Sequence, residues 1–132
     1  MYQFQTNKKI TKVHGTGNEN KKNYEIVLLG DEASASASEV LIAGLKDNFN
    51  YKFVGKKTYG KGSVQEVMNL STDLKAKITT KSWLTPNSVN LTEAGGIVPD
   101  IEVAMDNKYY ETYSLDDDNQ YNRAIDYIVN GK

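Results

Sequence analysis

The stretch that decides the fold reads IVLLGDEASASASEVLIAGLKDNF over residues 26–49. The apolar run from Tyr24 to Leu29 is typical of a strand covered on both faces. From Ala37 onward the apolar residues recur at helical spacing, which predicts a helix over residues 37–48 with one face on a sheet. A buried strand followed directly by an amphipathic helix indicates an α/β fold.

The junction between this strand and this helix holds a serine-alanine repeat, Ser34-Ala35-Ser36-Ala37-Ser38-Glu39. Ser36 and Glu39 form a capping-box pattern, in which the serine only satisfies free N–H groups of the first helical turn. The same position suits a nucleophile. A serine at a strand-to-helix junction exposes its hydroxyl, and nearby N–H groups and the helix dipole stabilise an oxyanion. The two roles are compatible, and this segment alone leaves both open.

A lysine between two glycines lies in the next motif, Tyr59-Gly60-Lys61-Gly62-Ser63-Val64-Gln65. A serine hydrolase can use an amine as its base in place of imidazole, and this chain has one histidine. A lysine with the ordinary pKa of about 10.4 is protonated at neutral pH, so the role requires burial, which lowers such a pKa by roughly 3–5 pH units. Tyr59 and Val64 offer an apolar wall. In an extended chain Lys61 and Gln65 share one face, where the Gln65 amide can orient the amine.

Two other chemistries compete with this interpretation. Residues 55–61 match the first seven positions of a nucleotide-binding P-loop, but Gly62 stands where serine or threonine holds magnesium, and the following residues alternate like a strand. Nucleotide binding is therefore disfavoured. A Ser-His-Asp triad built on His14 is the other alternative, although a lone histidine far from any partner is more often a surface residue than a base.

Composition limits the class of protein. A chain of 132 residues predicts one domain, and a net charge of −1 disfavours a nucleic-acid partner. No cysteine occurs, which excludes disulfides and cysteine-based metal sites. The apolar run Ile26–Leu29 is far shorter than the roughly 20 residues of a membrane helix, and the first fifteen residues lack the apolar centre of a signal peptide.

The remaining segments predict further strands and one more helix. Alternation and turn signals predict strands at Tyr2–Thr6, Ile10–Val13, Tyr51–Val54, Val64–Leu70, Leu74–Leu84 and Ile101–Val103, and a polar loop over residues 15–23. In the strand that ends at Leu84, Leu74 and Ile78 belong to the face predicted to be buried and Trp83 to the wet face. Asp116-Asp117-Asp118 precede a C-terminal amphipathic helix that stops at Gly131, and capping is favoured over calcium binding for these acids.

Four segments in one order resemble the C-terminal processing (tail-specific) serine peptidases: Ser34–Glu39, Thr58–Gln65, Thr85-Pro86 and Gly96–Ile101. The resemblance covers most of residues 24–130, with Ala33 and Ser88 standing where that family commonly has glycine. It implies that Ser36 is the nucleophile, Lys61 the general base and Gln65 the residue that positions the base, with the Ala37 N–H as an oxyanion-hole donor.

The resemblance also implies a fold, a class of substrate, a domain organisation and a location for the protein. The fold expected is a crotonase/ClpP-like α/β protease core with a mixed sheet, no cofactor and no metal, and substrates that are protein or peptide C-terminal tails. Residues 1–132 are then one domain, the C-terminal part of a catalytic core whose PDZ domain and N-terminal part are absent. Isolated, the chain is expected to be weak or inactive and to associate as a homo-oligomer; its location by resemblance is extracytoplasmic. The alternative of another class is a non-catalytic peptide-binding or assembly module.

Overall fold

The computed structural model describes residues 2–7, 9–15, 17 and 24–131, and Lys8 and most of the polar loop predicted over residues 15–23 lie outside that range. Its elements, in chain order, are β1 (Tyr2–Thr6), β2 (Lys9–Val13), β3 (Val27–Gly30), α1 (Ala37–Phe49), β4 (Lys52–Gly55), β5 (Ser63–Asn69), β6 (Lys75–Leu84), α2 (Leu91–Ala94), β7 (Ile101–Glu102), α3 (Asn107–Thr112), the 3₁₀ turn η1 (Leu115–Asp117) and α4 (Asn119–Asn130).

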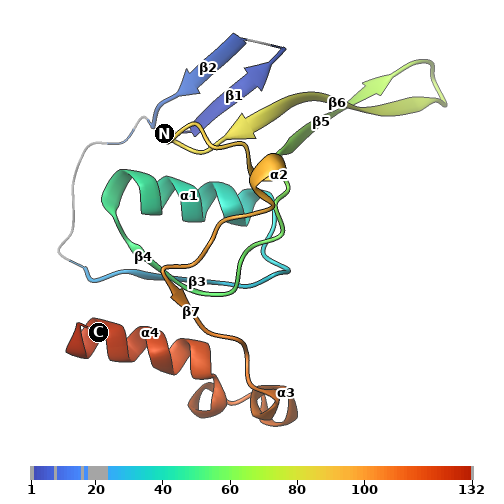
Figure 1. The fold of residues 1–132 in the computed structure, drawn as a ribbon. Helices are drawn as coiled ribbons and strands as arrows, with labels where there is room; N and C mark the ends of the chain where they lie inside the picture. The colour runs from blue at the N-terminus through green and yellow to red at the C-terminus, as the bar shows by residue number, and fades with distance from the viewer. Residues whose placement is uncertain (1, 8, 16, 18–23, 132) are drawn as a thin grey trace.

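The strands form two sheets. One is antiparallel, with the order β2-β1-β6-β5, and the other is parallel, with the order β3-β4-β7. Helix α1 lies between the two sheets, and α4 covers the opposite side of the parallel sheet (Figure 1). The α/β class is confirmed, and the parallel and antiparallel pairings expected of a mixed sheet occur here in separate sheets.

The core lies where α1 meets both sheets. Ile42 and Ala43 on α1 pack with Leu28 of β3 and Phe53 of β4, and Phe53 is completely buried because β4 is the central strand of its sheet. The helix begins and ends within one residue of its predicted bounds, and Asn50 follows it in the left-handed conformation that commonly ends a helix.

The first apolar strand differs from its prediction. It begins at Val27 instead of Tyr24, and it is not covered on both faces, because Leu29 is 43% exposed. Strand β3 lies at the edge of the parallel sheet, and the described part of the chain supplies no strand beyond it.

The hairpin of β5 and β6 was predicted with the correct strands, and Leu84 is buried as predicted, but burial is concentrated at the base of the hairpin instead of along one whole face of β6. Leu74 and Ile78 are exposed because the outer half of the hairpin projects away from the body of the molecule (Figure 1). Trp83, assigned to the wet face, is 4% exposed and belongs to the core, since the base of β6 pairs with β1. Trp83 stands opposite Phe4 in that pairing.

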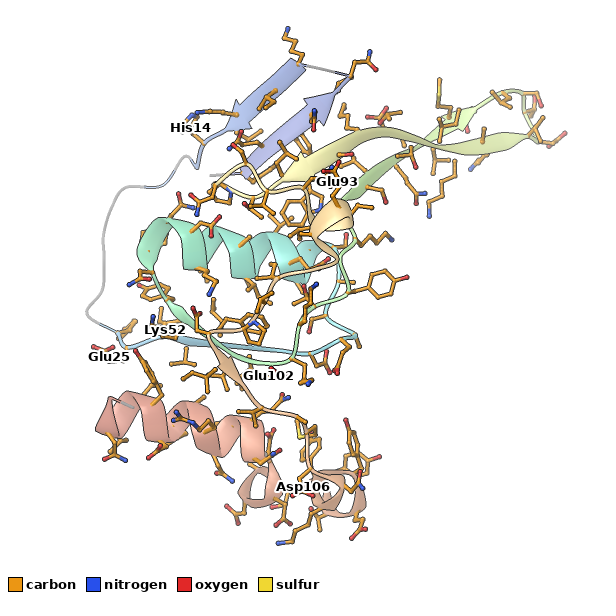
Figure 2. The ribbon with its side chains drawn as sticks, viewed as in Figure 1. His14, Glu25, Lys52, Glu93, Glu102 and Asp106 are labelled. Atoms are coloured by element: carbon orange, nitrogen blue, oxygen red, sulfur yellow. The ribbon has the colours of Figure 1, made fainter. Side chains whose placement is uncertain are left out.

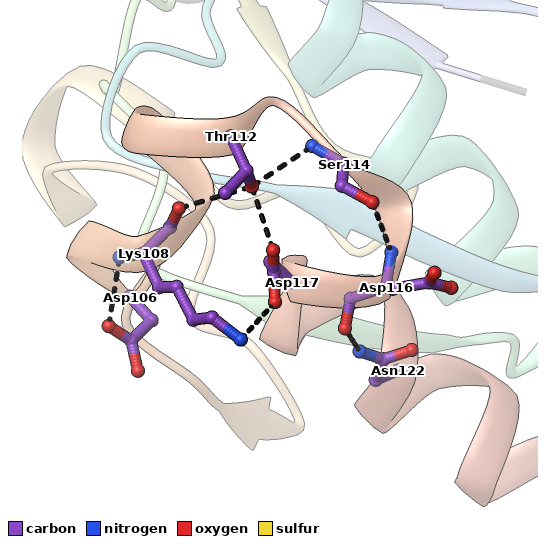
Figure 3. A network of polar contacts seen from close by, with 7 residues as sticks. All are labelled: Asp106, Lys108, Thr112, Ser114, Asp116, Asp117 and Asn122. Carbon is purple, nitrogen blue, oxygen red and sulfur yellow. Dashed lines mark hydrogen bonds and ion pairs between the residues drawn. The ribbon is translucent and has the colours of Figure 1, made fainter.

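Aspartates hold the C-terminal segment together in the way that capping predicts. Asp118 accepts a hydrogen bond from the Tyr121 N–H at the start of α4, and Asp117 pairs with Lys108 and accepts a hydrogen bond from the Thr112 hydroxyl at 2.8 Å (Figure 3). The hydrogen bonds from Lys108 and Thr112 hold the pKa of Asp117 below its usual range. Helix α4 ends at Gly131 as predicted.

One ion pair ties the helix of the core to the loop before β7. Asp100 accepts a hydrogen bond from the Phe53 N–H at 2.9 Å and pairs with Lys46 of α1. Partial burial works to raise the pKa of Asp100, but the Lys46 and Phe53 hydrogen bonds outweigh it and hold that pKa below its usual range. Among the described residues, no helix has the length and apolar character needed to cross a bilayer.

Candidate active site

The strand-to-helix junction places Ser36 at the cap position before α1, with backbone angles of φ 57° and ψ −110°. A residue other than glycine rarely adopts a positive φ, and such strain is concentrated at functional sites. The turn before it is rigid, because the Ser34 hydroxyl donates to the Asp31 carboxylate at 3.0 Å and accepts from the Asp31 N–H at 3.0 Å. The serine is thus held in a strained conformation by a well-bonded loop.

Glu39, in the first turn of α1, joins two loops: the serine loop, residues 31–36, and the lysine loop, residues 56–62. Its side chain is completely buried. One carboxylate oxygen accepts from the Ser36 N–H at 2.8 Å and from the Lys61 N–H at 2.9 Å. The other accepts from the Thr58 hydroxyl at 2.6 Å and from the Gly60 N–H at 2.7 Å. One carboxylate therefore positions the backbone of both candidate catalytic residues.

The pattern Ser36-x-x-Glu39 predicted only half of this role. The capping contact to the Ser36 N–H is present as expected, but the contacts to residues 58–61 were not anticipated. A capping box reports only local contacts, so nothing in its spacing indicates a partner some twenty residues away.

Two further contacts fix the lysine loop from its other side. The Trp83 indole N–H donates to the Lys61 carbonyl at 2.9 Å, and the Trp83 backbone N–H donates to the Gly62 carbonyl at 2.9 Å. The Tyr59 N–H donates to the Ser34 carbonyl at 3.0 Å, which adds a direct bond between the two loops. The backbone of Lys61 is therefore held at both its N–H and its carbonyl.

Thr58 and two glycines let the loops approach this closely. Thr58 is buried, and its hydroxyl accepts from the Ile97 N–H at 2.8 Å while donating to Glu39. Gly60 has φ 91°, and a Cβ there would lie 2.8 Å from backbone atoms of residues 95 and 96. Gly96 has φ 109°, and a Cβ there would lie 2.1 Å from the Thr58 carbonyl oxygen. Both positions require glycine.

The four residues to which the family resemblance assigns a role line one pocket of about 520 Å³. Ser36, Ala37, Lys61 and Gln65 contribute to its wall, together with Ser63 and Lys77. The rest of the wall is apolar or aromatic, from Tyr2, Phe4, Val40, Val64 and Trp83. Ala37 is the first residue of α1, whose first N–H groups have no partner within the helix. The pocket thus combines a hydroxyl, an amine, an amide and an available N–H donor.

Two expectations about the lysine are not met in this chain. Lys61 is exposed instead of buried, and Tyr59, which is 67% exposed, does not line the pocket that Lys61 shares with Ser36. Gln65 is also exposed, and its amide lies 3.5 Å from the Thr79 hydroxyl. No hydrogen bond between the Ser36 hydroxyl and the Lys61 amine is found within the described residues.

The competing chemistries find no support in the geometry. Residues after the P-loop-like segment form strand β5 and not the helix whose N-terminus would bind phosphate. His14 follows β2 on the side of the C-terminal end of α1, away from the first turn of that helix (Figure 2). Within residues 2–7, 9–15, 17 and 24–131, no group of three or more histidine or acidic side chains is placed to hold a metal ion.

Proteins with similar sequences are named as processing or CtpA-like serine proteases. Carboxy-terminal processing protease CtpB of Bacillus subtilis is 40% identical over 83 residues, which cover 63% of this chain and 17% of that protein. A probable CtpA-like serine protease of Staphylococcus epidermidis is 35% identical over 103 residues, which cover 78% of this chain and 21% of that protein. The chain therefore spans about a fifth of the length of these relatives.

A solved structure shows the same fold. The photosystem II D1 C-terminal processing protease superposes with a TM-score of 0.67 at 30% sequence identity, over 77% of this chain and 26% of that one. The model of Peptidase family S41 matches residues 1–103, which include both loops of the site. The chain belongs to peptidase family S41.

Proposed function

We propose that this chain carries the nucleophile and the base of a serine endopeptidase that hydrolyses peptide bonds near protein C-termini. Ser36 is the nucleophile, Lys61 the general base, Gln65 the residue that orients the base, and the Ala37 N–H one donor of the oxyanion hole. The observation that supports it most is that these four residues line one pocket while Glu39 fixes the backbones of Ser36 and Lys61. Membership of family S41 and the names of its processing-protease relatives support the same assignment.

The proposed reaction has two halves. The Ser36 oxygen attacks the peptide carbonyl carbon as its proton passes to the neutral Lys61 amine, and the Ala37 N–H donates to the resulting oxyanion. The C–N bond breaks when the Lys61 ammonium returns the proton to the leaving amine, which leaves an acyl-enzyme. Lys61 then takes a proton from water, the hydroxide attacks the ester, and Ser36 leaves with its proton restored. No cofactor enters either half.

The chain is in this proposal the C-terminal part of a longer catalytic core. Residues 1–132 form one domain that spans about a fifth of its relatives, and Lys61 lies exposed where the chemistry requires a desolvated amine. The missing core supplies that cover, a further oxyanion donor and, by family resemblance, a PDZ domain. Losing one such donor typically lowers the rate by about 10²–10³-fold, so the isolated chain is weak or inactive. By the same resemblance we place the protein outside the cytoplasm.

The exposed lysine favours one alternative, a non-catalytic peptide-binding or assembly module on the same scaffold. An open pocket with an apolar wall binds peptide equally well without a desolvated base. Labelling of the nucleophile distinguishes the two functions, because only an activated serine reacts rapidly with an organophosphorus probe.

The experiment compares fluorophosphonate labelling of the chain and of the longer polypeptide that we propose carries it. Specific labelling is expected to be lost in Ser36→Ala and in Lys61→Ala. Ser38→Ala and Lys57→Ala are matched controls and should retain it, since Ser38 lies in the first turn of α1 and Lys57 in the loop that holds Lys61, and neither lines the pocket. Labelling that persists in Ser36→Ala would refute the nucleophile, and none in the longer polypeptide would support the binding module.

A further inference from the structure

The pocket of the candidate site carries positive charge that the proposed reaction does not use. Two of its lining residues are charged, and both are lysines, Lys61 and Lys77. Lys77 is exposed and makes no ion pair with any acid in the described part of the chain. Lys81 on the same strand, by contrast, pairs with Glu66 at 2.8 Å. Lys77 is therefore a free cation beside the place where a peptide would bind.

The strand register places Lys77 at a defined distance from the site. In the β5–β6 hairpin, Gln65 pairs with Thr79, and two residues further out Val67 pairs with Lys77. Strands advance about 3.3 Å per residue, so Lys77 lies roughly 7 Å beyond the pair that holds Gln65. An extended substrate covers that distance with two residues. Lys75 comes two residues later still, opposite Asn69, and does not line the pocket.

We propose that Lys77 forms a carboxylate-binding subsite about two residues from the scissile bond, next to the apolar part of the pocket. This rests on the proposed peptide-cleaving function, of which it names a specificity element. The ligand is a carboxylate adjoining an apolar residue, because the rest of the wall, including Phe4 and Val40, favours apolar groups. The carboxylate comes from an aspartate or glutamate side chain or from a free C-terminus, and the two sources are separated below.

Trp83 allows peptide binding in this pocket to be followed by fluorescence. It is the chain's one tryptophan and it lines the pocket, so its fluorescence reports occupancy of this pocket. The experiment uses the Ser36→Ala chain, which binds peptide without turning it over. The probes are apolar octapeptides in which a single glutamate, or a glutamine in its place, is moved along the peptide. Each probe is made with a free and with an amidated C-terminus.

The expected result is that glutamate at one position, or the free C-terminus, tightens binding about 1.5- to 5-fold over the neutral form, as an exposed ion pair allows. The gain should vanish in Lys77→Gln and at about 1 M salt, where charges are screened within roughly 3 Å. It should remain in Lys75→Gln, the matched control. Dependence on glutamate identifies a side-chain carboxylate, and dependence on amidation identifies the C-terminus.

Equal binding of all charged and neutral probes would overturn the subsite, as would a preference that survives Lys77→Gln. Failure of the subsite and failure of the proposed function remain distinguishable. Serine labelling with no carboxylate preference removes only the subsite, whereas a Lys77-dependent preference without serine labelling keeps the subsite in a binding module. Absence of binding by every probe overturns the subsite, while the proposed function is decided by serine labelling of the longer polypeptide.

Discussion

Replacing Glu39 should separate the two loops of the site, and the structure sets the size of the effect. In Glu39→Ala, the N–H groups of Ser36, Gly60 and Lys61 and the hydroxyl of Thr58 all lose their acceptor. An unsatisfied buried polar group costs about 1–3 kcal/mol. Since Ser36 and Lys61 are exposed, water can reach part of this set, and we expect a loss of about 3–5 kcal/mol, as for breaking a buried charged network.

Glu39→Gln tests whether the carboxylate is needed or only its shape. Each oxygen of Glu39 accepts two hydrogen bonds, so an amide nitrogen in place of either oxygen faces two donors and loses both bonds. The expected loss is about 2–4 kcal/mol. Against a total stability of roughly 5–15 kcal/mol, both variants should still contain a folded population at low denaturant.

Urea unfolding followed by Trp83 fluorescence measures these losses in stability. The rate of fluorophosphonate labelling reports whether the Ser36 hydroxyl keeps its reactivity. Glu93→Ala is the control: Glu93 is an exposed acid in the first turn of α2 with a hydrogen bond from Asn90 (Figure 2). Its change should stay within about 0.5 kcal/mol. A loss below about 1 kcal/mol in Glu39→Ala, at an unchanged slope against urea, would refute the joining role of this carboxylate.

Three other predictions use urea unfolding, which is followed by far-UV circular dichroism for Trp83→Phe because that variant lacks the chain's one tryptophan. Trp83→Phe keeps an aromatic ring but removes the donor to the lysine loop, so it should cost about 1–2 kcal/mol and slow serine labelling, and labelling at the wild-type rate would contradict this. Gly96→Ala should cost at least about 2 kcal/mol because its Cβ would strike the Thr58 carbonyl at a positive φ, whereas Gly44→Ala, which has open space inside α1, should gain up to about 1 kcal/mol. The pKa of Asp100 is depressed in the folded state, so its contribution is present above about pH 4 and is lost as pH falls through the folded-state pKa. Asp100→Asn should lower stability at pH 7 and flatten the acid loss below about pH 4.

Local patterns in the sequence predicted the strands and the two long helices of this fold, missed the short elements α2, α3 and η1, and predicted burial less well. Helix α1 and the β5–β6 hairpin follow from spacing alone, because both are defined by contacts within a short stretch. The buried position of Trp83 depends instead on β1, which pairs with β6 from the other end of the chain. Alternation alone assigns two faces to a strand but does not say which face a distant segment covers.

The sequence likewise predicted the residues of the candidate site but not the contacts between its loops. The motifs named Ser36, Lys61 and Gln65, and the pocket brings them together. The turn after Thr85-Pro86 shows how a departure from the family pattern is accommodated: Ser88, which stands where that pattern has glycine, adopts φ 66°, and its hydroxyl accepts a hydrogen bond from the Gln3 side chain at 3.0 Å. The role of Glu39 and the exposure of Lys61 escaped prediction because both depend on how separate loops meet.

In the candidate site the backbones of Ser36 and Lys61 are held by hydrogen bonds, whereas their side chains are exposed. The backbones of Ser36 and Lys61 are held by Glu39, and Trp83 adds a second hold on Lys61. Their side chains face an open pocket in which the amine is hydrated. Contacts among the described residues thus position the backbones of Ser36 and Lys61, but they do not shield the lysine amine from water. In the longer core that we propose, the part outside this chain therefore needs to contribute cover and a second N–H donor, and it need not rearrange either loop. On this reasoning, adding the rest of the core should raise the rate of Ser36 labelling much more than it shifts the environment of Trp83.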